Sequence, residues 1–141
     1  MTPPAGRGSK QTGATGGNRT ARWLIPPIYM VVLFVLASVP DNGKTQTVLS
    51  DVPATLQNVL HAPAFGLLAI LWAWALGARG VRAGYPFVAG GLIAVATGAL
   101  LEVWQLWIPG RFPSLLDAVW NTAGVVLTLG TYWLVGARTP P

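Results

Sequence analysis

The chain of 141 residues has no cysteine, one histidine and little charge. Without cysteine it can form no disulfide, thiolate metal site or cysteine nucleophile, and one histidine disfavours a multi-histidine metal centre. We therefore expect no metal and no cofactor. Charged residues make up 9% of the sequence, against about 25% in ordinary soluble domains. This scarcity argues against an average cytosolic enzyme.

What the sequence has in abundance is apolar side chains. Hydrophobic residues account for 52% of the chain, which includes seven tryptophans, and the mean hydropathy is +0.53. Such a composition is typical of a chain solvated by lipid. We predict an integral membrane protein.

The nine basic residues, against four acidic ones, do not form a nucleic-acid-binding face. Four of them precede residue 23 and the others stand singly between apolar runs, so we expect no nucleic-acid partner. Residues 1–21 are rich in Gly, Thr, Pro and basic residues and have no apolar periodicity. This composition predicts a disordered cytoplasmic tail, followed by a membrane domain over residues 22–137.

Four apolar segments follow the tail, at about residues 23–40, 56–76, 87–109 and 115–135. Each is close to the ~20 residues that a helix needs to cross the hydrocarbon core. The fold class predicted is all-α, a four-helix bundle with four transmembrane helices. Only Gly110–Ser114 separates the last two segments, which predicts an antiparallel hairpin.

The basic residues also predict the orientation of the bundle. Seven of them fall in the tail, the second loop and the C-terminus, whereas only Lys44 and Arg111 fall in the other two loops. Because Lys and Arg are enriched on the cytoplasmic side, both termini should lie in the cytoplasm. This is an N-in, C-in topology.

Polar side chains that lie inside apolar segments are the candidate functional residues, because ionisable groups are costly in a membrane. In the predicted topology, the polar side chains of the last three helices and the arginine of the hairpin loop lie at a similar depth in the membrane, near its outer surface. We predict an outward-facing polar pocket there. Its candidate members are His61, Glu102, Gln105, Arg111, Asp117 and Asn121.

Small and polar residues recur at helical spacing on the last two segments. One stripe contains Gly90, Ala94, Gly98 and Glu102, and the other runs from Asp117 to Thr131. Small residues allow close approach of membrane helices. We expect these two stripes to pack against each other, with the acidic residues at their outer ends.

The hairpin resembles the VanZ-like membrane proteins. These combine E-x-x-Q with R-x-P-S-x-x-D-x-x-x-N-x-x-G, which this chain matches from Glu102 to Gly124, and an upstream helix that bears His, here His61. Many relatives carry Lys three residues before that His and Tyr four after it, where this chain has Asn58 and Phe65. The resemblance covers about residues 23–136.

The resemblance implies a four-helix, multi-pass protein of the bacterial cytoplasmic membrane. The family is named for a member that gives low-level resistance to the lipoglycopeptide teicoplanin, by a mechanism that is not established. A phenotype is therefore implied, but no chemistry.

The first functional hypothesis is a non-enzymatic envelope protein whose pocket binds an amphiphile. The ligand would be a membrane lipid, a lipid-linked cell-wall precursor or an acylated glycopeptide. Arg111 would hold an anionic group, the other polar side chains would bind the headgroup, and apolar helix faces would take the chain.

Two alternatives stay open. One is an intramembrane lipid or glycolipid hydrolase or transferase in which His61 works with Glu102 or Asp117 as general acid and base, although the sequence has no recognisable catalytic motif. The other is a structural or assembly subunit of a membrane complex, in which the polar cluster only locks the helices together. The sequence does not indicate the oligomeric state.

Overall fold

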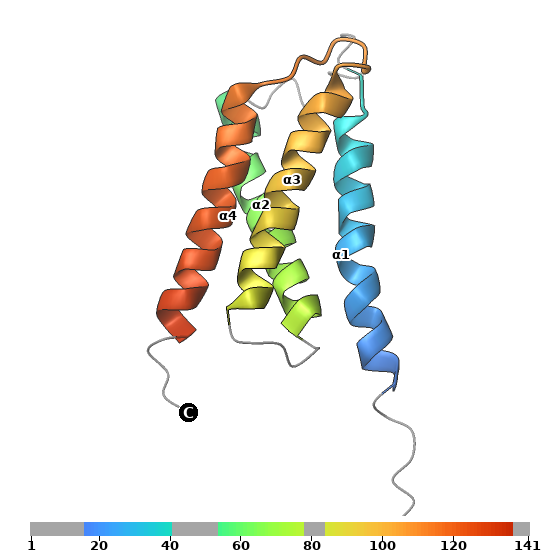
Figure 1. Ribbon diagram of the computed structural model, residues 1–141. Coiled ribbons are helices and arrows are strands. Elements are labelled where there is room, and N and C mark those ends of the chain that lie inside the picture. The colour runs from blue at the N-terminus through green and yellow to red at the C-terminus, as the bar shows by residue number, and fades with distance from the viewer. Residues whose placement is uncertain (1–15, 41–53, 78–83, 137–141) are drawn as a thin grey trace, which may run out of the picture.

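A computed structural model describes residues 16–40, 54–77 and 84–136, and in this part of the chain all regular structure is helical. Four helices follow one another up and down the bundle (Figure 1). They are α1 (Gly16–Ala37), α2 (Ala54–Gly77), α3 (Tyr85–Gln105) and α4 (Leu115–Gly136). The predicted all-α class is confirmed.

Three of the helices are long and apolar enough to cross a membrane, namely Asn58–Gly77 of α2, Tyr85–Gln105 of α3 and Leu115–Val135 of α4. In α1 the apolar stretch Arg22–Ala37 is shorter than the ~20 residues of a typical span. Large apolar side chains such as Leu92 and Leu127 are exposed on the outside of the bundle, as lipid-facing side chains would be. The described residues thus support a multi-pass membrane protein, and a fourth span stays a prediction.

The first turns of α1 and the last turns of α4 lie at the same end of the bundle (Figure 1). This arrangement is compatible with termini on one side of a membrane. Most of the basic residues that predict which side lie outside the described residues, as do residues 1–15 of the predicted tail. The tail was expected to reach residue 21, whereas α1 begins at Gly16.

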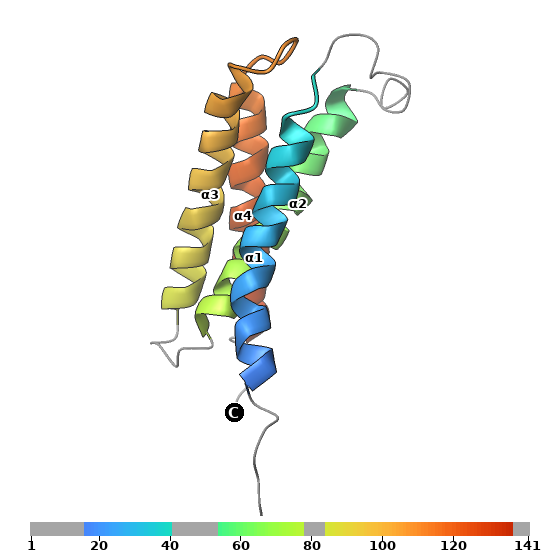
Figure 2. The ribbon, with the colours of Figure 1, turned by 90° about the vertical axis from the view of Figure 1, so that its right-hand side faces the viewer.

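Helix α2 is the centre of the bundle, because it packs on each of the other three helices. The buried core is built from Phe65, Leu68 and Ala69 of α2 with apolar residues of the other helices, including Leu101 and Val125. Helix α1 contacts α2 and, less closely, α3. The view turned by 90° shows α1 in front of α2 (Figure 2).

The small-residue stripes pack differently from the prediction. A Cβ placed on Gly124 of α4 would collide with the backbone carbonyl of Ala62, and one on Gly90 of α3 would lie 2.7 Å from the carbonyl oxygen of Ala69. Both partners belong to α2. The two stripes therefore pack against α2 as well as against each other, and the expected contact between α3 and α4 is made where Gly98 lies beside Asn121.

The predicted hairpin of α3 and α4 is confirmed, but α3 ends at Gln105 and not at residue 109. The chain then turns through Ile108–Arg111, where the Arg111 N–H donates to the Ile108 carbonyl over 3.1 Å. Pro109 and Gly110 occupy the central positions, and Gly110 has φ 77°. This is the pattern of a type II turn, which needs a positive φ at its third residue.

Candidate functional site: a polar cluster at one end of the bundle

All six predicted site residues lie at the end of the bundle where α3 ends and α4 begins, at the top of Figure 1. Glu102, Gln105 and Asn121 are buried, and His61, Arg111 and Asp117 are partly buried. We call these residues, together with Ser114, the polar end cluster. Its hydrogen bonds show which members work together.

The Glu102 carboxylate is hydrogen-bonded to Ser114, the residue directly before α4. Its Oε2 accepts a hydrogen bond from the backbone N–H of Ser114 over 2.7 Å. Ser114 is the N-cap of α4, since its carbonyl accepts the first helical bond from Ala118 and its Oγ accepts from the N–H of Asp117 over 3.3 Å. In a capping box the third residue of the same helix would take the Ser114 N–H. Here a carboxylate from α3 takes it.

This contact explains how a carboxylate is tolerated in an apolar helix. Arg111 and His61 lie at the same end of the bundle, but the hydrogen bond of Glu102 comes from a backbone donor at a helix N-terminus. The partial positive charge of that terminus stabilises an anion. His61 and Asp117 are also close enough to Glu102 to interact with it electrostatically.

His61 pairs with Asn121 across the interface between α2 and α4. Its Nδ1 lies 3.1 Å from Asn121 Oδ1, and the amide oxygen accepts a hydrogen bond in the tautomer that has its proton on Nδ1. The imidazole stacks on the Phe65 ring, with centroids 6.3 Å apart and planes 7° apart. Asn121 is only 2% exposed, and the lack of a side chain at Gly98 leaves room for its amide group.

Arg111 contacts the chain just after α1, and its Nε hydrogen bond is not to Glu102. Its Nε donates to the Val39 carbonyl over 3.1 Å, just beyond the last turn of α1. A cation is favourable at a helix C-terminus. Beside it, Trp104 Nε1 donates to Ser38 Oγ over 2.8 Å, and Ser38 Oγ donates to the Phe34 carbonyl. These contacts attach the end of α1 to the α3–α4 hairpin.

Gln105 is buried in the last turn of α3, at 5% exposure, and its backbone carbonyl accepts from Ile108 at the start of the turn. The candidate residues therefore form two connected groups. His61 and Asn121 join α2 to α4, whereas Glu102 and Ser114 join α3 to α4. Arg111 reaches a third place, the end of α1.

Sequence reasoning placed the candidate residues at one end of the helices, put Phe65 on the same face as His61 and considered Trp104 as a pocket residue, but it missed the contacts of Ser114 and Ser38. Ser114 could have been found, because Ser114–Asp117 is an S-x-x-D pattern before an apolar helix, which is a known N-cap signal. The contact from Trp104 to Ser38 joins residues 66 positions apart and has no local signal.

An apolar groove of about 490 Å³ runs along α1, and Trp104 of α3 forms part of its wall. It is lined by Pro27, Met30, Phe34, Ser38 and Trp104, among others. Its polar end is thus the Ser38–Trp104 pair. Among the described residues, no group of three or more His, Asp or Glu side chains could hold a metal ion.

Fold and site together define a small multi-pass helical membrane protein with a polar cluster at one end of its bundle. The particular family follows from a comparison of sequences, in which the family model described as VanZ/LLP1 matches residues 8–136. The chain belongs to this family, and the resemblance noted in the hairpin is confirmed. No curated protein and no solved structure matches the chain.

Proposed function

We propose that the protein binds an amphiphile of the bacterial envelope at the polar end cluster, on the outer side of the cytoplasmic membrane. The observation that carries this proposal is the apolar groove along α1, which is lined by Ser38 and Trp104, next to the Val39 carbonyl that Arg111 contacts. Sites for amphiphiles usually combine an apolar groove, which binds the acyl chain, with nearby polar groups, which bind the headgroup. The proposal includes four spans with both termini in the cytoplasm.

Charge in the cluster supports a polar or ionic headgroup as ligand. The Arg111 guanidinium uses Nε for the Val39 carbonyl, and the terminal N–H groups of a guanidinium form a planar fork that suits a carboxylate or phosphate. Asp117 and His61, both within electrostatic range of Glu102, add further hydrogen-bonding groups. A membrane lipid, a lipid-linked cell-wall precursor and an acylated glycopeptide all combine such a headgroup with a chain.

The same cluster favours one competing function, a structural clamp. The bonds from Glu102 to Ser114 and from Arg111 to Val39 each join separate elements, so their loss would loosen the bundle. An experiment must therefore separate charge from the hydrogen bonds that hold the helices. Glu102→Gln does this, because the amide oxygen can still accept from Ser114 while the charge is lost.

The test is the susceptibility of a bacterial host to teicoplanin and vancomycin, with the amount of protein in the membrane measured in parallel. We expect the wild type to raise tolerance selectively to teicoplanin, the acylated drug, and Glu102→Gln and Arg111→Ala to lose this effect at unchanged abundance. Thr122→Ala is the matched control, since exposed Thr122 bonds only to the Ala118 carbonyl of its own helix.

Each other pattern argues against the proposal. If the wild type alters neither susceptibility, binding of an acylated glycopeptide is excluded as its role. If Glu102→Gln and Arg111→Ala lose tolerance only in proportion to their abundance, the cluster is a structural clamp. Turnover of labelled envelope lipids by the purified protein, abolished in Glu102→Gln, would indicate the enzymatic alternative with His61.

A further inference from the structure

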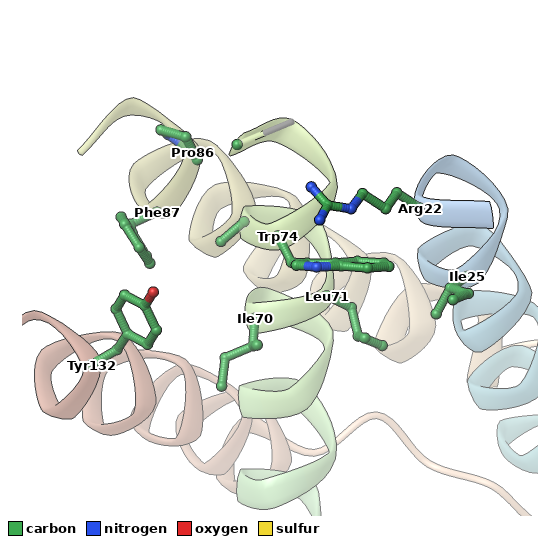
Figure 3. Close-up of a pocket in the computed structure, with 10 residues that line it drawn as sticks. Arg22, Ile25, Ile70, Leu71, Trp74, Pro86, Phe87 and Tyr132 are labelled. Atoms are coloured by element: carbon green, nitrogen blue, oxygen red, sulfur yellow. The ribbon is translucent and has the colours of Figure 1, made fainter. Parts of the chain in front are cut away.

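A second groove lies at the opposite end of the bundle, where α1 begins and α4 ends (Figure 3). Its volume is about 490 Å³, within the ~300–1,000 Å³ range of small-molecule sites. All four helices contribute to its lining, which includes Arg22, Ile25, Ile70, Trp74, Phe87 and Tyr132.

The walls of this groove are apolar apart from one cation. Arg22 lies over the Trp74 indole, with the guanidinium carbon 4.9 Å from the ring centroid. The N–H groups of a guanidinium lie in its own plane. When its face lies over an aromatic ring, these groups can still donate to an anion at its edge. On the other side of the groove, the rings of Phe87 and Tyr132 are in contact, with centroids 4.7 Å apart.

The charge of Arg22 is not neutralised within the described part of the chain. The acidic residues there are Glu102 and Asp117, and both belong to the polar end cluster at the other end of the bundle. Arg22 makes no ion pair with any described residue. An occupant that complements this groove must therefore combine an apolar chain with an anionic group at the Arg22 end.

We propose that this groove binds an anionic phospholipid, with the phosphate at Arg22 and one acyl chain along Ile25, Ile70 and Phe87. Trp and Tyr rings are enriched at headgroup depth, which fits Trp74 beside Arg22 and Tyr132 on the opposite wall of an otherwise apolar groove. Anionic lipids are also attracted by basic residues next to membrane helices. The site is separate from the polar end cluster and does not depend on the function proposed for it.

The first test removes the charge of Arg22. The full chain, purified in a neutral detergent, is titrated with phosphatidylglycerol and with phosphatidylcholine of the same acyl chains, and bound lipid is counted by native mass spectrometry. We expect tighter binding of phosphatidylglycerol, and Arg22→Gln should weaken it roughly tenfold, the loss typical of a charged hydrogen bond. Binding of phosphatidylcholine should not change.

Arg19→Gln is the matched control, because it removes the same charge from the same helix, three residues earlier. It should leave the preference for phosphatidylglycerol in place. An equal loss in Arg19→Gln and Arg22→Gln would mean diffuse attraction to basic residues, and equal affinity of the wild type for both lipids would mean that no headgroup is recognised. Either result overturns the proposal.

The second test fills the groove. Gly77 lines it, and a Cβ at Gly77 would meet no atom of the described residues within 4 Å, so Gly77→Leu adds a side chain to the lining of the groove without a clash at Cβ. Gly130 has the same free space on α4 but does not line the groove, which makes Gly130→Leu the control.

We expect Gly77→Leu to lose retention of phosphatidylglycerol and Gly130→Leu to keep it, with unchanged thermal unfolding in both. Unchanged retention in Gly77→Leu would overturn the proposal. So would conversion of a dimer to a monomer by Gly77→Leu with lipid retention intact, because a second copy of the chain would then be the occupant.

Discussion

At the scale of single residues, Glu102 has two properties that substitution can separate. It carries a charge, and it accepts the backbone N–H that begins α4. The charge belongs to the proposed ligand site, whereas the hydrogen bond belongs to the fold. Replacing Glu102 by an isosteric neutral acceptor or by a small apolar residue should therefore have different effects on stability.

We expect Glu102→Ala to lower the free energy of unfolding by about 1–3 kcal/mol, because the Ser114 N–H loses its buried acceptor. Glu102→Gln keeps an acceptor and loses only the attraction to the helix terminus, about 0.3–1 kcal/mol. Thermal unfolding of the purified variants in detergent checks the order. Equal stability of the two variants would show that the contact to Ser114 does not hold α4.

Gly124 is the residue at which the backbone itself must come close to another helix. A Cβ there would collide with the carbonyl of Ala62, and backbone cannot move aside as a flexible side chain can. We expect Gly124→Ala to cost about 1–3 kcal/mol or more, the usual penalty of overpacking. The measurement is again detergent unfolding, together with the yield of folded protein.

Gly130→Ala is the comparison on the same helix, because nothing lies within 4 Å of its Cβ position. It should be neutral, or more stable by up to about 1 kcal/mol, since alanine favours a helix more than glycine does. If both variants were equally stable, α2 and α4 would not be in the close contact described.

At the scale of elements, α1 is the most loosely attached helix. It packs against α2 and α3 but makes no contact with α4 within the described residues. Its attachments are few and specific. Arg111 and Trp104 hold its C-terminal end, the Tyr29 hydroxyl donates to the Ala64 carbonyl over 3.2 Å, and Arg22 stacks on Trp74.

We expect the double variant Trp104→Phe with Arg111→Gln to loosen the end of α1 and little else. The phenyl ring keeps an aromatic contact with Phe34 but has no donor for Ser38. Two lost hydrogen bonds, at about 0.5–1.5 kcal/mol each, should raise hydrogen exchange in residues 30–38 by roughly tenfold or more. Exchange in α4 is the internal control, and faster exchange in both helices would mean that the bundle unfolds as one unit.

At the scale of the whole molecule, the absence of cysteine makes the orientation of the bundle measurable. Single cysteines can be placed at Ser9, Lys44, Arg82 and Thr139 of a chain that has no other. With four spans and both termini in the cytoplasm, a membrane-impermeant maleimide should label only Lys44→Cys in intact cells. The other three should react after permeabilisation.

The same experiment decides between four spans and three. If α1 did not cross, Ser9→Cys and Lys44→Cys would be labelled alike, because both would lie on one side of the membrane. Labelling of Ser9→Cys and Thr139→Cys, but not of Lys44→Cys, in intact cells would mean that the whole bundle is inverted.

The pattern of the sequence was sufficient to predict much of this protein. Apolar runs of about 20 residues predicted the helices, because the hydrocarbon core demands that length. The short, turn-rich Gly110–Ser114 segment predicted the α3–α4 hairpin. Family membership could be recognised from the spacing between Glu102 and Gly124, and the structure places all six candidate residues at one end of the bundle.

The sequence could not indicate which helix packs against the small-residue stripes, or which group stabilises the buried carboxylate of Glu102. Stripes on α3 and α4 fit each other as well as they fit α2, and the placement of α2 between them is a result of packing three helices at once. Several partners were available to the carboxylate, and its distance from each depends on the fold of the Ile108–Arg111 turn.

The sequence by itself thus determined the apolar character of this protein, its helices and the end of the bundle at which the six candidate residues lie. These properties depend on local composition and on the helical repeat. Only the tertiary structure decided that Glu102 accepts the N–H of the α4 N-cap Ser114, that Arg111 contacts the end of α1, and that Arg22 lines an apolar groove. Such contacts join residues far apart in the chain, so they depend on how the helices approach one another.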